Sequence, residues 1–202
     1  MTAPLLLLGP NTPAGGIRHA PRGAPVGRLV RPSPLRGPPL LGRAQPQRTV
    51  MTSLDIFSDP ICPWCYIGKT HLDRALAAEP DAPFRIRWLP FMLNPDMPAG
   101  GMDRRAYLEG KFGGKDGAVR AYAPVAEHAE QAGLALDLGR IARTPSTVDA
   151  HRLIHWAEVE GVQTAVVSAL FRAYFEEGRD IGDAEVLADV ADGCGLDASL
   201  VL

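Results

Sequence analysis

Two cysteines, three positions apart, lie between a strand pattern and a helix pattern, and this placement constrains the fold more than any other feature. Residues 53–58 read Ser-Leu-Asp-Ile-Phe-Ser, a short strand pattern that Asp59 and Pro60 end. The run Cys-Pro-Trp-Cys at 62–65 (the CPWC motif) comes next. It is followed by apolar residues at helical spacing, namely Ile67, Leu72, Ala75 and Leu76. The chain must therefore carry the motif from the end of a strand into the start of a helix.

A second strand and then a long helical stretch are predicted after the motif. Two prolines end the first helix, and residues 84–88 alternate apolar and charged side chains as a half-exposed strand does. Strand, helix and strand in this order open an α/β sheet. Beyond a loop, the pattern predicts helices at 104–112, 119–132, 151–160, 164–177 and 184–192. Ser146, with Asp149 three residues on, predicts a capping box for the third of these.

The first 50 residues differ in composition from the rest. They hold seven arginines, no lysine, no acidic residue and ten of the 19 prolines, so their charge is +7 and the remaining residues carry −9. A proline-rich segment without periodicity cannot bury enough apolar surface to fold. We interpret residues 1–50 as a disordered Pro/Arg-rich tail or as a mis-assigned start upstream of Met51. A secretory signal and a transit peptide fit less well, because Leu5–Leu8 is too short for an apolar core and prolines break an amphipathic helix.

Composition excludes several classes of protein. No apolar run is longer than four residues, the length of Leu5–Leu8, so no segment spans a membrane. Three cysteines in 202 residues do not make a disulfide-rich secreted scaffold, and a net charge of −2 gives no basic surface for nucleic acid. Because no credible signal peptide is present, we expect a cytoplasmic protein. The sequence does not indicate an oligomeric state.

The CPWC motif has two main chemical interpretations, a zinc ligand pair and a redox dithiol. Structural zinc needs four ligands, and the remaining cysteine, Cys194, has no partner at a suitable spacing. His151 and His155 lie one helical turn apart, but they lack the glutamate of a zinc protease motif, and we interpret them as part of a polar helix face. We therefore expect neither a metal nor another cofactor.

The redox interpretation explains the position of the motif as well as its composition. Cys62 falls at the N-cap of the predicted helix, where unpaired backbone N–H groups and the helix dipole stabilise a thiolate. Pro63 suits the first helical turn, because its missing N–H would be unpaired there. Cys65 follows one turn later and should be more buried than Cys62.

These positions give the cysteines different expected roles. Cys62 would attack a disulfide, Cys65 would resolve the mixed disulfide, and Pro63 and Trp64 would tune the stability of the thiolate. Asp59 is interpreted as a turn residue before proline, in preference to a proton acceptor for Cys65. The plain alternative is a pair of cysteines that have this spacing by chance.

Three segments carry a family resemblance: 58–69 (SDPICPWCYIGK), 88–95 (WLPFMLNP) and 144–152 (TPSTVDAHR). Together they resemble the DsbA-like thioredoxin family, in its FrnE-type branch, over about residues 53–200. The resemblance implies an α/β, thioredoxin-like fold at 51–202, with a strand–helix–strand unit at 51–95 and an inserted helical domain at 103–193. It also implies dithiol–disulfide exchange with thiols of proteins or of small molecules such as glutathione.

Two features of the resemblance leave alternatives open. The family's later strands carry a cis-proline beside the cysteine pair, and no such segment occurs before Leu202, so we expect C-terminal strands to be missing. A chain incomplete in this way could be a truncated, non-catalytic remnant. The related 2-hydroxychromene-2-carboxylate isomerases use glutathione and carry serine where Cys62 stands, so a glutathione-dependent isomerase-like enzyme is the other alternative. The presence of both cysteines favours the oxidoreductase.

Overall fold

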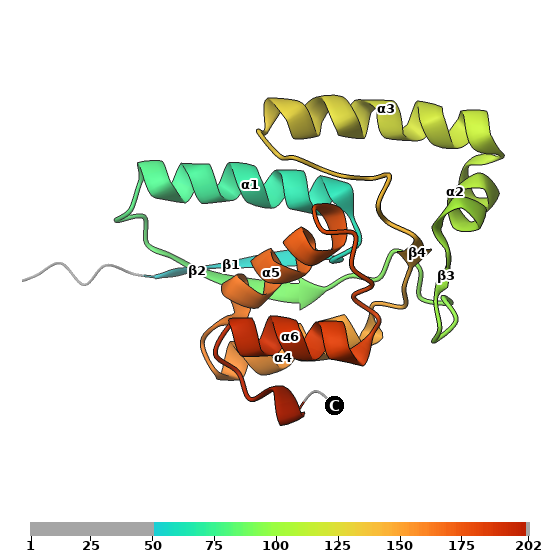
Figure 1. Ribbon diagram of the computed structural model, residues 1–202. Helices are drawn as coiled ribbons and strands as arrows, with labels where there is room; N and C mark the ends of the chain where they lie inside the picture. The colour runs from blue at the N-terminus through green and yellow to red at the C-terminus, as the bar shows by residue number, and fades with distance from the viewer. Residues whose placement is uncertain (1–50, 201–202) are drawn as a thin grey trace, which may run out of the picture. The chain divides into compact units, whose positions relative to one another are not determined.

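The computed structural model describes residues 51–200 of the chain (Figure 1). The predicted tail or mis-assigned start at 1–50 lies outside the described residues. Two strands, β1 (Thr52–Ser58) and β2 (Phe84–Pro90), pair in parallel, with Thr52 opposite Phe84 and Ser58 opposite Pro90. The helix α1 (Pro63–Ala78) joins them. The predicted order of strand, helix and strand is confirmed.

Alternation along the strands gives the sheet two different faces. Ile56 of β1 and Ile86 of β2 are half-buried and contact the main hydrophobic core. Phe57, which points to the other face, is 65% exposed. Because side chains alternate along a strand, one face of the sheet packs against helices while Phe57 lies open to solvent in the described part of the chain.

Helices make up most of the remaining described chain. They are α2 (Arg104–Phe112), α3 (Lys115–Gln131), α4 (Val148–Val159), α5 (Gln163–Phe175) and α6 (Ala184–Gly193), and a short 3-10 turn, η1 (Ala198–Leu200), follows them. A short antiparallel pair, β3 (Met102–Asp103) and β4 (Arg143–Thr144), lies among them. Within residues 51–200, none of these helices is long and apolar enough to cross a membrane. The helical prediction for this half of the chain is confirmed.

Two predicted helix starts are wrong. The helix α3 begins at Lys115, one turn before the predicted start, because the pair of glycines in front of it turns the chain into the helix. Ser146 does not cap α4, since Thr147 is the N-cap residue and makes no side-chain hydrogen bond to the helix start. Asp149, expected in a capping box, instead forms an ion pair with Arg152 at 2.5 Å.

The helix α5 is the centre of the hydrophobic core. Its inward side chains are almost fully buried, among them Leu170, Phe171, Tyr174 and Phe175. It packs against β2, α4 and α6, and Figure 1 shows α4 and α6 side by side. Trp88 of β2 joins the same core. Helices thus cover one face of β2 and fix where its end lies.

The first residue of α5 hydrogen-bonds the backbone of β2. Gln163 is buried, and its side-chain amide accepts from the N–H of Trp88 at 2.8 Å and donates to the carbonyl of the same residue at 2.9 Å. The indole of Trp88 donates to the Thr164 hydroxyl at 3.0 Å. A side-chain amide has the same donor and acceptor as a peptide group. Gln163 therefore satisfies the outer edge of β2 as a neighbouring strand would.

A second, smaller cluster joins α1 to α3. Ile67 of α1 is buried against Val125, Ala129 and Ala132 at the C-terminal half of α3. Arg74, also on α1, donates to the Ala132 carbonyl at 2.6 Å, which gives a partner to one of the carbonyls that a helix end leaves unpaired. The helix that carries the CPWC motif is thereby held by α3 as well as by the main core.

Candidate functional site

The CPWC motif lies where β1 ends and α1 begins. Cys62 is the N-cap residue of α1, with an extended backbone at φ −90° and ψ 112°. Its N–H donates to the Asp59 carbonyl at 2.9 Å, and its own carbonyl accepts from the N–H groups of Cys65 and Tyr66 at 3.1 and 3.2 Å. Pro63 occupies the first turn and is buried. The predicted N-cap position of Cys62 is therefore confirmed.

The two cysteine side chains interact directly and are not joined in a disulfide in this structure. The interaction between the Cys62 and Cys65 sulfurs raises the pKa of Cys62 and lowers the pKa of Cys65 to about 6. The backbone N–H groups of Cys65 and Trp64 act on Cys62 in the opposite direction and lower its pKa. The pair therefore holds one thiolate at neutral pH. The pKa is thus lowered at Cys65, whereas the N-cap position predicts the thiolate at Cys62.

The expected difference in burial between the two cysteines is absent, since Cys62 and Cys65 are both half-buried. The extended backbone of the N-cap residue turns Cys62 toward its partner instead of into solvent. Between them, the Trp64 side chain is 47% exposed. Its ring meets the ring of His128 on α3 edge to face, with centroids 5.3 Å apart and planes at 62°. Trp64 thus presents an aromatic surface next to the sulfurs.

Asp59 is a turn residue, as predicted, but it does more than turn the chain. Its side chain is fully buried, and its carboxylate accepts from the N–H of Leu93 at 2.7 Å and of Ile61 at 3.3 Å. Burial raises the pKa of Asp59, and these hydrogen bonds, together with one from Thr147, act to lower it. Because Leu93 follows β2, the carboxylate ties the turn before the motif to the chain that leaves the second strand.

His151 does not lie on a polar helix face, contrary to the sequence prediction. It is half-buried beside Asp59, and burial lowers its pKa against the opposing charge of that carboxylate. His155, one turn further along α4, is exposed as expected. The signal that could have indicated burial of His151 is its position next to Ala150, which is buried, at the edge of the apolar face of α4.

Aromatic stacking anchors the start of α1 to the core. The ring of Tyr66 stacks on Phe171 and Phe175 of α5, with centroids 4.9 and 5.9 Å apart. Its hydroxyl donates to Glu176 at 2.5 Å, and burial, together with this hydrogen bond, raises the pKa of Tyr66. Sequence reasoning missed this anchor, because the partners lie more than 100 residues away along the chain. It fixes the helix turn that follows Cys65.

The third cysteine belongs to a different part of the structure. Cys194 is the C-cap residue of α6, is half-buried, and has a pKa that burial raises. It pairs with no other cysteine in the described chain. Among residues 51–200, no three or more histidine, cysteine, aspartate or glutamate side chains gather in a group that could hold a metal ion.

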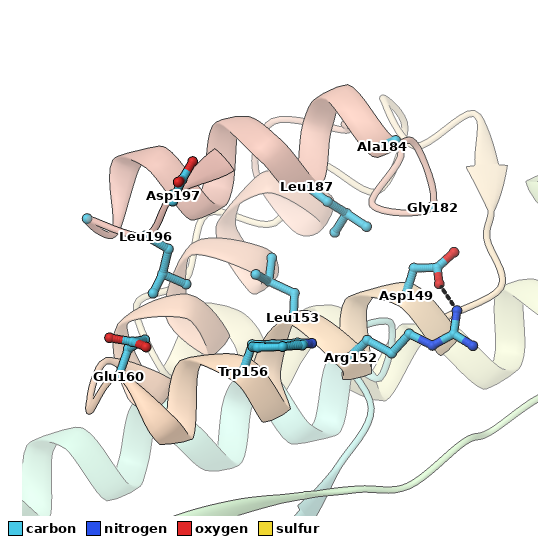
Figure 2. Close-up of a pocket in the computed structure, with 11 residues that line it drawn as sticks. Asp149, Arg152, Leu153, Trp156, Glu160, Gly182, Ala184, Leu187, Leu196 and Asp197 are labelled. Atoms are coloured by element: carbon cyan, nitrogen blue, oxygen red, sulfur yellow. Dashed lines mark hydrogen bonds and ion pairs between the residues drawn. The ribbon is translucent and has the colours of Figure 1, made fainter. Parts of the chain in front are cut away.

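The pocket between α4 and α6 contains no residue of the CPWC motif. Its volume is about 440 Å³. Figure 2 shows Leu153 of α4 and Leu187 of α6 pointing into it from opposite sides, with Trp156 along its floor. The ion pair between Asp149 and Arg152 lies at one end (Figure 2). The candidate site is therefore the cysteine pair with its surroundings, and not this pocket.

The family of the chain follows from a comparison with protein families. The family described as DSBA-like thioredoxin domain matches residues 53–201. This chain belongs to that family. The predicted DsbA-like thioredoxin fold is therefore confirmed, as a mixed α/β fold with several helices and few strands.

Individual relatives agree with this assignment. The crystal structure of a probable DsbA oxidoreductase from Streptomyces coelicolor superposes with a TM-score of 0.65 at 33% identity, covering 74% of this chain and 65% of that one. The cytosolic disulfide reductase DsbM from Pseudomonas aeruginosa, solved with GSH, has a TM-score of 0.52 at 21% identity, covering 74% and 70%. The uncharacterized protein YwbO of Bacillus subtilis is 24% identical over 151 residues, which are 72% of this chain and 68% of YwbO. The chain thus spans about two thirds of the length of these relatives.

Proposed function

We propose that this protein is a thiol–disulfide oxidoreductase that exchanges an electron pair between the dithiol of Cys62 and Cys65 and the disulfides of other molecules. The observation that carries the proposal is the position of the two cysteines at the N-terminus of α1, where Cys62 is the N-cap residue and its carbonyl accepts from the Cys65 N–H at 3.1 Å. A thiolate held at a helix N-terminus, with a second thiol in reach, is the chemical requirement for such exchange. Membership of the DSBA-like family supports it.

The reaction takes two substitution steps at sulfur. In the reducing direction, a thiolate of the pair attacks one sulfur of a substrate disulfide, a mixed disulfide forms, and the first substrate thiolate leaves. The second cysteine then attacks the enzyme sulfur of the mixed disulfide, the Cys62–Cys65 bond forms, and the second substrate thiolate leaves. Two electrons pass to the substrate, and the reverse sequence oxidises a substrate dithiol.

Cys62 is the proposed attacking residue. The backbone N–H groups that lower its pKa favour a thiolate there once the shared proton moves to Cys65, and exposed Trp64 offers a contact surface for a substrate next to it. Cys65 has Ser58 and Asp59 around its sulfur, and the charge of Asp59 acts to raise its pKa. Cys65 is therefore the proposed resolving residue, and Pro63 and Trp64 are proposed to tune the pair.

The proposed substrates are thiols and disulfides of proteins or of glutathione, in the cytoplasm. The Pseudomonas relative is a cytosolic disulfide reductase solved with GSH, which supports this class of partner. In a reducing compartment a stable structural disulfide is unusual, whereas a catalytic one is compatible. Three expectations stay predictions, namely the FrnE-type branch, the helical insertion at 103–193 and the missing C-terminal strands.

Trapping of the mixed disulfide tests the proposal. The full chain, with Cys194→Ser as the background, is mixed with glutathione disulfide, quenched with acid and weighed. Cys65→Ser should retain glutathione on Cys62, because nothing resolves it, whereas the parent should pass on to an internal disulfide. If neither the parent nor Cys65→Ser takes up glutathione, the oxidoreductase proposal is wrong.

A second assay separates the isomerase-like alternative. The parent protein is incubated with 2-hydroxychromene-2-carboxylate and reduced glutathione, and isomerisation is followed by absorbance. An oxidoreductase should show no turnover there. A truncated remnant would be inactive in both assays.

A further inference from the structure

A small internal cavity lies beside the end of β1. Its volume is about 10 Å³, and side chains from β1, β2, α4 and α5 line it. Apolar side chains form most of the wall, including Trp88, Ile154 and Phe171. The polar side chains of the wall are those of Ser58, the last residue of β1, and His151 of α4.

These two side chains each bring an unpaired polar atom to the cavity. Ser58 Oγ and His151 Nε2 are shielded from solvent and have no hydrogen-bond partner among the described residues, and Ser58 is 7% exposed. A buried polar atom without a partner costs about 1–3 kcal/mol. An ordered water usually satisfies such atoms, and it needs a space of about 10–15 Å³ and at least two polar partners. The cavity meets both conditions.

The cavity also adjoins the cysteine pair through Ser58. The interaction with Cys62 is the largest cause that lowers the pKa of Cys65, and the nearby Ser58 hydroxyl lowers this pKa further. That hydroxyl therefore lies beside the Cys65 sulfur, although it makes no well-formed hydrogen bond. The Ser58 hydroxyl thus lies between the Cys65 sulfur and the cavity.

His151 is suited to accept a proton on the far side of the cavity. Burial lowers its pKa, while the charge of Asp59 and a hydrogen bond to the Phe91 backbone oppose that effect. Since Nε2 has no partner among the described residues, Nδ1 is the ring nitrogen left to interact with the Phe91 backbone. A proton on Nδ1 leaves Nε2 as an acceptor.

We propose that the cavity binds one water molecule, which bridges Ser58 and His151 and completes a path by which the proton of Cys65 reaches His151. The proposal rests on the function proposed above.

The resolving step creates the need for this path. Once Cys62 is part of a mixed disulfide, it has no thiol proton to donate, so Cys65 takes up a proton and must lose it again before it attacks. Cys65 gives its proton to Ser58 Oγ, the serine passes its own proton to the water, and the water passes one to His151 Nε2.

The electrons then move between sulfurs. The Cys65 thiolate attacks the Cys62 sulfur, the Cys62–Cys65 bond forms, and the bond between Cys62 and the substrate breaks. The substrate sulfur leaves as a thiolate with the electron pair of that bond, and the proton on His151 returns to solvent. Ser58 touches the reacting sulfur of Cys65 and takes part in the proton transfer itself, whereas His151 acts only through the water and Ser58.

The test uses single-turnover kinetics of the full chain with glutathione disulfide. Ser58→Ala and His151→Leu remove the two ends of the bridge, and His151→Gln keeps an acceptor near the position of Nε2. Ser53→Ala, at an exposed position of β1, and His155→Leu, at an exposed position of α4, are matched controls. Acid quenching and mass measurement give separate rates for formation and resolution of the mixed disulfide.

Ser58→Ala and His151→Leu should form the mixed disulfide within about twofold of the parent rate and resolve it about 100-fold more slowly, the size of a lost proton-transfer group. His151→Gln should resolve the mixed disulfide about as slowly as His151→Leu, because its amide can hold the water but cannot take up a proton, and the two controls should match the parent. A high-resolution crystal structure should show a water at about 2.8 Å from both polar atoms.

The outcomes separate this proposal from the proposed function. If the parent resolves its mixed disulfide and Ser58→Ala and His151→Leu do so equally fast, the proton path is wrong and the oxidoreductase stands. If the parent forms no mixed disulfide, both proposals fall. A variant that forms the mixed disulfide normally and has the far-UV circular dichroism spectrum of the parent is folded, so its slow resolution is not a folding defect.

Discussion

The carboxylate of Asp59 accepts a hydrogen bond from the backbone N–H of Leu93 at 2.7 Å, and this bond joins the turn before the cysteine pair to the exit of the second strand. Asp59 precedes α1 and Leu93 follows β2, so both of these elements lie between the two residues along the chain. The geometry of the CPWC motif therefore depends on a carboxyl group whose burial disfavours its charged form.

Asp59→Asn should change how stability depends on pH. Burial raises the pKa of Asp59 above 3.8, so the folded state binds this proton more tightly than the unfolded chain does. This stabilisation is complete below the pKa that Asp59 has in the unfolded chain, and it is lost as pH rises through the pKa that Asp59 has in the folded state. Its size is about 1.4 kcal/mol for each tenfold difference in proton affinity between the two states. The free energy of unfolding of Asp59→Asn, relative to the parent, should therefore rise as the pH increases above about 4.

Urea unfolding at several pH values measures this difference. The asparagine oxygen can keep the hydrogen bond from Leu93 but its NH2 group cannot accept the one from Ile61, and since that loss does not vary with pH, the pH dependence of the difference isolates the charge. Asp55→Asn, an exposed position on the same strand, controls for removal of a carboxyl group. A difference between Asp59→Asn and the parent that stays constant with pH would contradict the assignment.

The thiol titration of the reduced protein should show one early step. The interaction with Cys62 lowers the pKa of Cys65, so the first thiolate should appear with a midpoint at about 6, and the second thiol should ionise only above the ordinary range. Cys62→Ala should move the midpoint of Cys65 upward, because that interaction is gone. Thiolate absorbance in a Cys194→Ser background reports both. A single midpoint near 9.0, the ordinary cysteine value, for both thiols would show that they do not interact.

Gln163→Ala should destabilise the fold. The variant leaves the N–H and the carbonyl of Trp88 without their partners at 2.8 and 2.9 Å, in the middle of the core. Each unsatisfied buried group costs about 1–3 kcal/mol, so the free energy of unfolding should fall by about 2–6 kcal/mol. Gln131→Ala, at an exposed end of α3, should stay within about 0.5 kcal/mol of the parent. Equal stability of the two variants would mean that the side-chain amide of Gln163 does not satisfy the strand.

Tyr66→Phe should separate the hydroxyl of the anchor from its ring. The variant loses the hydrogen bond to Glu176 at 2.5 Å and keeps the stacking on Phe171 and Phe175. We expect a loss of about 1–2 kcal/mol in thermal or urea unfolding, and a larger loss for Tyr66→Leu, which also removes the ring. If Tyr66→Phe were as stable as the parent and Tyr66→Leu were not, the ring alone would anchor α1.

The sequence allows prediction of the elements that local patterns define. Alternation at 84–88 and helical spacing after Cys65 predict β2 and α1, and proline in the first turn places Cys62 at the N-cap, as the structure confirms. The family resemblance predicts the fold class. These features depend on residues that are close together along the chain.

The surroundings of the site could not be predicted in the same way. Several contacts around the site arise only when α4 and α5 pack on β2. They are those of Asp59 with Leu93, of Gln163 with Trp88, and of His151 with both the cavity and the end of β1. No local periodicity specifies which polar side chain will fill such a position. A histidine at the edge of an apolar helix face is predicted to be solvated until its packing partner is known.

The most direct test of the central claim is a redox titration of the full chain in glutathione buffers of graded composition. Thiols are alkylated at each ratio, and the labelled positions are found by mass. The account predicts that Cys62 and Cys65 lose and regain their labels together, as one two-electron couple, while Cys194 stays labelled throughout. Independent labelling of the two cysteines, or full labelling of both at every ratio, would contradict it.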